Sequence, residues 1–125
     1  MKLFLDTADV DSISDSFLTG LIDGVTTNPT LMMKSGKNPE DVYQDLINLG
    51  VPDISMEVVG DSYEMIQEGL RLFEKFGQQA TIKVPCTPDG LIACRELSRN
   101  LIKVNVTLIF SPSQAILAAK AGATY

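Results

Sequence analysis

Short apolar runs alternate with amphipathic segments from one end of the chain to the other. Five runs have the length and composition of β-strands, at 2–6, 24–27, 53–58, 80–84 and 103–108, and a sixth begins at 123–125. Between them, apolar residues recur at helical spacing over 9–18, 39–49, 62–76, 89–100 and 112–121. Because strands and helices alternate with short connections, the pattern predicts a parallel sheet with right-handed crossovers.

The ends of the predicted helices carry recognisable start and stop signals. Four helices follow a residue whose side chain can cap the first turn: Asn38, Asp61, Thr87 and Ser111. Asn38 and Thr87 each precede a proline at the first helical position, and Glu64 and Gln114 give the helix starts at Asp61 and Ser111 the spacing of a capping box. Glycine stands where three helices should end, at positions 50, 77 and 122. Periodicity and capping therefore predict the same boundaries.

The two faces of the predicted strands differ in polarity, and this separates two parallel folds that the element order allows. Strands of a doubly wound sheet are covered on both faces and normally form unbroken apolar runs. Here four strands carry polar or charged residues on one face, mostly near the carboxyl end. These faces contain Phe4, Asp6, Ser55, Glu57, Thr81, Lys83, Lys103, Asn105 and Thr107. In a β/α barrel such a face points inward, and its carboxyl end holds the active site.

We therefore predict one domain over residues 1–125 with the α/β architecture of a parallel (β/α)8 TIM-type barrel, of which the chain contains the first five or so βα units. The alternative is an antiparallel sheet with one solvated polar face, which the intervening helices disfavour. Buried polar groups without partners would cost roughly 1–3 kcal/mol each. The inward polar residues should therefore satisfy one another around a site.

Composition and charge remove several classes of function. The formal net charge of −6 argues against general nucleic-acid binding, which depends on an excess of Lys and Arg. The first residues do not resemble a signal peptide, and no apolar run approaches the roughly 20 residues needed to span a bilayer. The two cysteines match no disulfide framework or zinc pattern, so we expect a reduced, cytoplasmic protein. The absence of histidine excludes serine triads and the commonest metal sites.

Lys83 is the first candidate for chemistry. It lies between Ile82 and Val84 in the middle of a strand, where removal from water disfavours the charged ammonium form. A neutral amine can attack a ketone and form an iminium, which acts as an electron sink for carbon–carbon cleavage. The alternative is a buried lysine paired with Asp6 or Glu57 for structural reasons alone. The residue pattern by itself does not separate these two interpretations.

Several other polar residues near strand ends could serve the same chemistry. The carboxylates Asp6 and Glu57 end different strands and could divide the roles of base and proton carrier, although Asp6 could simply cap a helix. Asn28 lies on the loop after the second strand, where Asn before Pro is also a common turn choice. Asn105 and Thr107 must face the same way, as either a hydrogen-bonded core pair or substrate contacts.

Together these segments resemble the transaldolase and fructose-6-phosphate aldolase family of class I aldolases, in particular the small single-domain transaldolases. The resembling stretches are LFLDTAD at 3–9, GVTTNPT at 24–30, SMEV at 55–58, IKVPCTPDG at 82–90, NVTLIFS at 105–111 and AGATY at 121–125. They occur in the family's order and cover the whole chain. The Gly-Val-Thr-Thr-Asn-Pro and Lys-Val-Pro motifs are the most specific of them.

The resemblance implies a role for each matching residue. Lys83 would carry the Schiff base to a dihydroxyacetone unit, and Asp6 would take the proton from the donor hydroxyl. Glu57 and Thr107 would hold a water used in forming and opening the imine. Transaldolases carry Glu at this position and fructose-6-phosphate aldolases carry Gln. Glu57 therefore favours transfer between sugar phosphates, as in the pentose phosphate pathway, over simple aldol cleavage.

The resemblance also bears on substrates and assembly. Asn28 and Asn105 would hydrogen-bond hydroxyls of a sugar phosphate, and neither a metal nor an organic cofactor is implied. A complete β/α barrel takes about 200 residues or more, so we expect a C-terminally truncated chain. The family's phosphate-binding arginines and the aromatic residue that helps separate transaldolase from aldolase would lie beyond its end. Open sheet edges would favour a homo-oligomer or strand-swapped assembly, and an inactive, self-assembling half-barrel is the alternative function.

Overall fold

The computed structural model describes residues 1–125 and contains five strands among six α-helices. In chain order these are β1 (Phe4–Asp6), α1 (Val10–Phe17), β2 (Gly24–Thr26), α2 (Pro29–Ser35), α3 (Pro39–Asn48), β3 (Ile54–Glu57), α4 (Ser62–Phe76), β4 (Ala80–Pro85), α5 (Pro88–Arg99), β5 (Val104–Thr107) and α6 (Pro112–Ala121). A 3₁₀ turn, Gly77–Gln79, joins α4 to β4.

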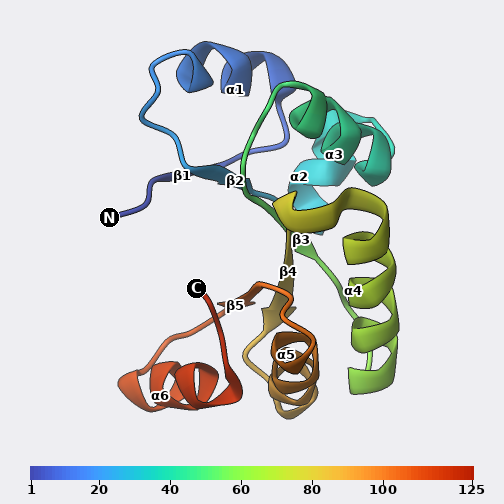
Figure 1. Ribbon diagram of the computed structural model, residues 1–125, viewed down its shortest axis with the longest axis vertical. Coiled ribbons are helices and arrows are strands. Elements are labelled where there is room, and N and C mark those ends of the chain that lie inside the picture. The colour runs from blue at the N-terminus through green and yellow to red at the C-terminus, as the bar shows by residue number, and fades with distance from the viewer.

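The strands form one parallel sheet in the order β1-β2-β3-β4-β5, each paired with its neighbour in the chain. Figure 1 shows the helices in an arc around the outside of the curled sheet, with both termini on its open side. This arrangement is part of a (β/α)8 barrel, so the predicted fold is confirmed. The antiparallel alternative is wrong, because every strand pair is parallel.

The core lies between the outer face of the sheet and the helices. It comprises 24 buried apolar residues, among them Ile54 and Ile82 on the strands and Leu46, Met65 and Leu97 on the helices. Complete burial of side chains of this size contributes about 1.5–3 kcal/mol each. Because the apolar faces turn outward to the helices, the polar faces of the same strands are left to line the inside of the curled sheet.

The helix α2 was not predicted from the sequence. It follows Asn28, whose Oδ1 accepts the Leu31 N–H at 3.0 Å, and it has Pro29 at its first position. It ends at Gly36, which adopts a left-handed φ of 69°. The Asn-Pro pair that resembled a turn is therefore a helix start, and the helix is too short to display a convincing period.

The predicted helix caps are largely confirmed. Asp61 and Glu64 form a reciprocal capping box at the start of α4. At α6 only one half of the box forms as expected, because Ser111 accepts the Gln114 N–H but the Gln114 side chain accepts the Phe110 N–H instead. The first turns are nevertheless satisfied in both helices, which fixes where the preceding loops leave the sheet.

Residues 123–125, where a sixth strand was expected to begin, form no strand. Their backbone nevertheless follows the edge of β5, because the N–H groups of Thr124 and Tyr125 donate to the Val104 carbonyl at 2.8 and 3.2 Å. The Tyr125 carbonyl in turn accepts the Val106 N–H at 3.0 Å. This contact holds the Tyr125 side chain at the inner side of the sheet.

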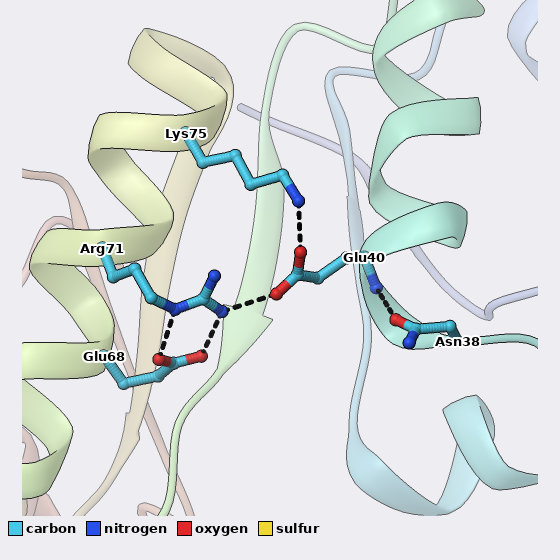
Figure 2. Close-up of polar contacts among 5 residues, drawn as sticks. All are labelled: Asn38, Glu40, Glu68, Arg71 and Lys75. Carbon is cyan, nitrogen blue, oxygen red and sulfur yellow. Dashed lines mark hydrogen bonds and ion pairs between the residues drawn. The ribbon is translucent and has the colours of Figure 1, made fainter.

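An ion-pair network on the surface joins α3 to α4 (Figure 2). Arg71 contacts Glu68 within its own helix and Glu40 on α3, each at 2.7 Å, and Lys75 also contacts Glu40. The backbone N–H of Glu40 donates to the capping residue Asn38. The hydrogen bonds from Lys75 and Arg71 lower the pKa of Glu40 below its ordinary value of 4.5.

We expect the Glu40→Gln variant to lose about 1 kcal/mol of stability at neutral pH, because exposed networks of this kind contribute little more. The lowered pKa means that the folded state favours the ionised carboxylate, so this contribution is present above about pH 4.5 and is lost as pH falls through the folded pKa. Urea unfolding at pH 7 and pH 3 measures the difference. An equal loss at both pH values would contradict the ion-pair explanation.

Candidate active site

Lys83 lies on the inner face of β4 with only 8% of its surface exposed. Its Nζ is 3.0 Å from Oε2 of Glu57, its register partner on β3, and it donates to the backbone carbonyl of Thr27 at 3.0 Å. A carboxylate from β3 and a carbonyl from the residue that follows β2 thus fix the position of the amine. Of the two carboxylates considered as partners from sequence, Glu57 makes the ion pair.

A cavity of about 650 Å³ opens at the carboxyl ends of the strands beside this amine. It brings together five of the six predicted site residues, namely Asp6, Asn28, Glu57, Lys83 and Thr107. These come from β1, the loop after β2, β3, β4 and β5, so that each strand contributes to the cavity directly or through the loop that follows it. Its location matches the position of active sites in β/α barrels.

Asp6 lines this cavity with an exposed side chain. Its Oδ1 accepts the hydroxyl hydrogen of Thr26 on β2 at 2.9 Å, which leaves Oδ2 without a partner in the chain. The alternative interpretation of Asp6 as a helix cap is wrong, because α1 begins after Asp9. Asp6 therefore presents one free carboxylate oxygen, held in place by its neighbour strand.

Asn105 is not brought to the cavity, although it is the register partner of Lys83 on β5. Its Nδ2 donates to the Ser55 hydroxyl at 3.1 Å, which directs the side chain toward the middle of the sheet. There it lines a second cavity of about 420 Å³ together with Phe4 and Tyr125. A shared strand face thus placed Asn105 on the inner side of the sheet, but its side chain leans away from the cavity that contains the other five residues.

A second polar cluster occupies the amino ends of the strands. Asp53, only 3% exposed, accepts hydrogen bonds from the Thr81 hydroxyl at 2.6 Å, the Lys103 Nζ at 2.9 Å and the Tyr125 hydroxyl at 3.0 Å. Lys2 donates to the same Tyr125 oxygen at 2.8 Å. The strand period predicts that Lys103 and Thr81 lie on the inner face, but it does not identify their partner. The available signal was the position of Asp53 two residues before Ser55, which puts both side chains on the same face of the strand.

Neither cysteine takes part in these polar clusters. Both thiols are free. Burial raises the pKa of Cys94 to about 11, so this thiol is protonated at neutral pH and is an ordinary core residue. The structure gathers no group of three acidic or sulfur ligands that could hold a metal ion. It also contains no helix with the length and apolar character required to cross a membrane.

Comparisons with known proteins identify the family. A family model described as Transaldolase/Fructose-6-phosphate aldolase matches residues 3–125. The chain is 51% identical to a probable transaldolase of Nitrosopumilus maritimus (strain SCM1), 55% identical to one of Anaeromyxobacter sp. (strain K) and 46% identical to one of Thermoplasma acidophilum. Each match covers 100% of this chain but only 56%, 58% and 57% of the relative. The resemblance found in the motifs is confirmed, and the chain belongs to the transaldolase/fructose-6-phosphate aldolase family.

Proposed function

We propose that Lys83 forms a Schiff base with a ketose phosphate and that the protein transfers a dihydroxyacetone unit between sugar phosphates. The observation that carries this proposal is a buried amine at the wall of a 650 Å³ cavity, with Asp6, Glu57 and Thr107 around the same space. We further propose that the reaction belongs to the non-oxidative pentose phosphate pathway and takes place in the cytoplasm.

The chemistry follows from the position of each group. Lys83 transfers a proton to Glu57, 3.0 Å away, and the neutral Nζ attacks the ketone carbon. Glu57 returns this proton to the former carbonyl oxygen and then carries a second proton from the carbinolamine nitrogen to the same oxygen, which leaves as water when the iminium forms. Glu57 and Thr107 hold that water, and they direct it back to the iminium carbon when the product is released. No electrons leave the system, so the steps require no redox partner.

Cleavage of the carbon–carbon bond requires a base on the other side of the iminium. The free Oδ2 of Asp6 accepts the proton of the donor's C4 hydroxyl while the C3–C4 electron pair moves into the iminium. An aldehyde departs and an enamine remains on Lys83. Attack of the enamine on an acceptor aldehyde, with Asp6 returning the proton, reverses these steps and completes the transfer. Asn28 and Asn105 are proposed to bind sugar hydroxyls, the second only after its side chain turns from Ser55.

Borohydride reduction in the presence of fructose 6-phosphate tests this proposal. We expect a covalent dihydroxyacetone adduct on Lys83 in peptide mass analysis, because borohydride reduces the iminium to a stable amine. Lys103 is an internal control, since it is also partly buried on the inner face but lies outside the cavity. Absence of an adduct at Lys83, or equal labelling of Lys103, would reject the Schiff-base role.

Two further functions remain as alternatives. Fructose-6-phosphate aldolase activity would use the same Schiff base, and it is favoured if free dihydroxyacetone is released as fast as it is transferred. An assembling role is suggested by β1, which has no further strand neighbour in the sheet, whereas residues 124–125 already bond to the edge of β5. We propose pairing of the β1 edges in a homo-oligomer. A compact monomer in sedimentation velocity at micromolar concentration would argue against this assembly.

A further inference from the structure

Thr26 is a half-buried residue of β2 that bonds directly to the proposed base Asp6. The two residues are register partners on neighbouring strands, and the Thr26 hydroxyl donates to Oδ1 of Asp6 at 2.9 Å. The Thr26 backbone carbonyl accepts the N–H of Thr7 at 3.2 Å. One residue of β2 therefore holds both the Asp6 side chain and the backbone that follows it. No chemical role for Thr26 followed from the sequence.

The Asp6 carboxylate has no other partner in the chain. Asp6 is exposed and forms no ion pair, whereas the Glu57 carboxylate is paired with Lys83 at 3.0 Å. Its strand, β1, has three residues and β2 as its only strand neighbour (Figure 1). An exposed carboxylate at the edge of a sheet samples several side-chain rotamers unless a neighbour holds it. The bond from Thr26 is therefore what restricts this carboxylate.

Thr26 itself has a well-defined position. It pairs with Asp6 of β1 on one side and with Ser55 of β3 on the other, so its backbone lies inside the sheet. Its side chain branches at Cβ, which restricts the first side-chain torsion and suits a β-strand. The hydroxyl is therefore presented to Asp6 from a rigid element, at little cost in side-chain entropy.

A neutral donor suits a carboxylate that has to accept a proton. An ammonium or guanidinium beside a carboxylate favours its charged form and so weakens it as a base. A hydroxyl instead orients the carboxylate through one directional hydrogen bond and brings no positive charge. Because Thr26 binds Oδ1 of Asp6, Oδ2 is the oxygen without a partner in the chain, and it lies on the residue that lines the 650 Å³ cavity.

We propose that Thr26 is a positioning residue for the carbon–carbon cleavage step, and that its hydroxyl holds the Asp6 carboxylate with Oδ2 available to the C4 hydroxyl of the donor. This inference rests on the proposed Schiff-base function and deepens it. The Thr26 side chain forms no hydrogen bond with Lys83 or Glu57, the pair that forms the iminium. Loss of the Thr26 hydroxyl should therefore slow cleavage and leave iminium formation unchanged.

The Thr26→Val variant of the whole protein tests this inference, because valine keeps the branched shape and removes the hydroxyl. With fructose 6-phosphate and no acceptor aldehyde, borohydride traps two adducts on Lys83 that differ in mass. The intact six-carbon donor with its phosphate is trapped before cleavage. The three-carbon dihydroxyacetone unit is trapped after cleavage, once the enamine carbon has taken a proton from water. We expect the three-carbon adduct to form about ten-fold more slowly, with the total labelling of Lys83 unchanged.

Two further variants separate positioning from a general loss of a hydrogen bond. Thr81→Val also removes a hydroxyl that donates to a carboxylate inside the curled sheet, at 2.6 Å to Asp53, but this pair lies outside the 650 Å³ cavity. It should leave the ratio of the two adducts at the wild-type value. Thr26→Ser keeps the hydroxyl and should recover most of the three-carbon adduct.

A double variant with Asp6→Asn shows whether Thr26 acts through Asp6. If it does, adding Thr26→Val to Asp6→Asn should cause little further loss of the three-carbon adduct. Independent, multiplicative losses would overturn the inference. A wild-type ratio of adducts in Thr26→Val, or an equal loss of both adducts, would overturn it as well. A wild type that traps neither adduct would instead overturn the proposed function, and the role of Thr26 with it.

Discussion

The Lys83→Met variant is expected to lose the proposed dihydroxyacetone transfer by a factor on the order of 10⁴ or more. The reason is chemical, because methionine fills a similar volume but cannot form an iminium, and Lys83 is the only lysine that lines the 650 Å³ cavity. The neighbouring carboxylates of Asp6 and Glu57 cannot replace the iminium as an acceptor of the electron pair from the broken carbon–carbon bond. Transfer from fructose 6-phosphate to an acceptor aldehyde phosphate, measured together with borohydride labelling, gives the result directly.

Two further variants make this prediction specific. Lys83→Arg keeps a cation between Glu57 and the Thr27 carbonyl, so it should fold normally and still be inactive. Lys120→Met changes an exposed lysine of α6 that has no ion-pair partner and should retain full activity. Substantial transfer by Lys83→Arg would show that the amine serves only as a structural cation, the interpretation that the residue pattern left open.

The Asp53→Ala variant is expected to lose about 3–5 kcal/mol of unfolding free energy. Asp53 is nearly inaccessible and accepts hydrogen bonds from Thr81, Lys103 and Tyr125. Its removal leaves an ammonium and two hydroxyls without their partner inside the curled sheet, and such groups are costly when desolvated. The midpoint and slope of urea unfolding, followed by circular dichroism, measure the loss.

The matched control for this prediction is Asp15→Ala, since Asp15 is exposed on α1 and its side chain makes no hydrogen bond. That change should alter stability by no more than about 0.5 kcal/mol. A loss below about 1 kcal/mol for Asp53→Ala would mean that water takes over the role of the carboxylate at the amino end of the sheet. The cluster would then not be needed to hold Tyr125 against β5.

The arrangement of the strands could be predicted because the period of a strand is two. Once Lys83 was assigned to the inward face of β4, Thr81 had to share that face. The same rule placed Glu57 on the inward face of β3. The rule does not state how a side chain leans along the strand, which is why it grouped Asn105 with the cavity residues although a hydrogen bond to Ser55 turns it away. Long-range partners of this kind are not encoded in local spacing.

Other features had no local signal. The Thr27 group that contacts Lys83 is a backbone carbonyl, which every residue possesses. The short helix α2 was missed because its start resembled a turn, although Asn28 caps it.

The cap at the start of α2 also limits what Asn28 can offer a ligand. Its carbonyl oxygen accepts the Leu31 N–H, so the NH₂ group is the part of the side chain that has no partner in the chain. Asn28 therefore offers a ligand mainly hydrogens, because one of the two lone pairs of its carbonyl oxygen is already used. Aspartate at this position would preserve the helix start and reverse that polarity, so that a single-atom exchange would change recognition while leaving the fold intact.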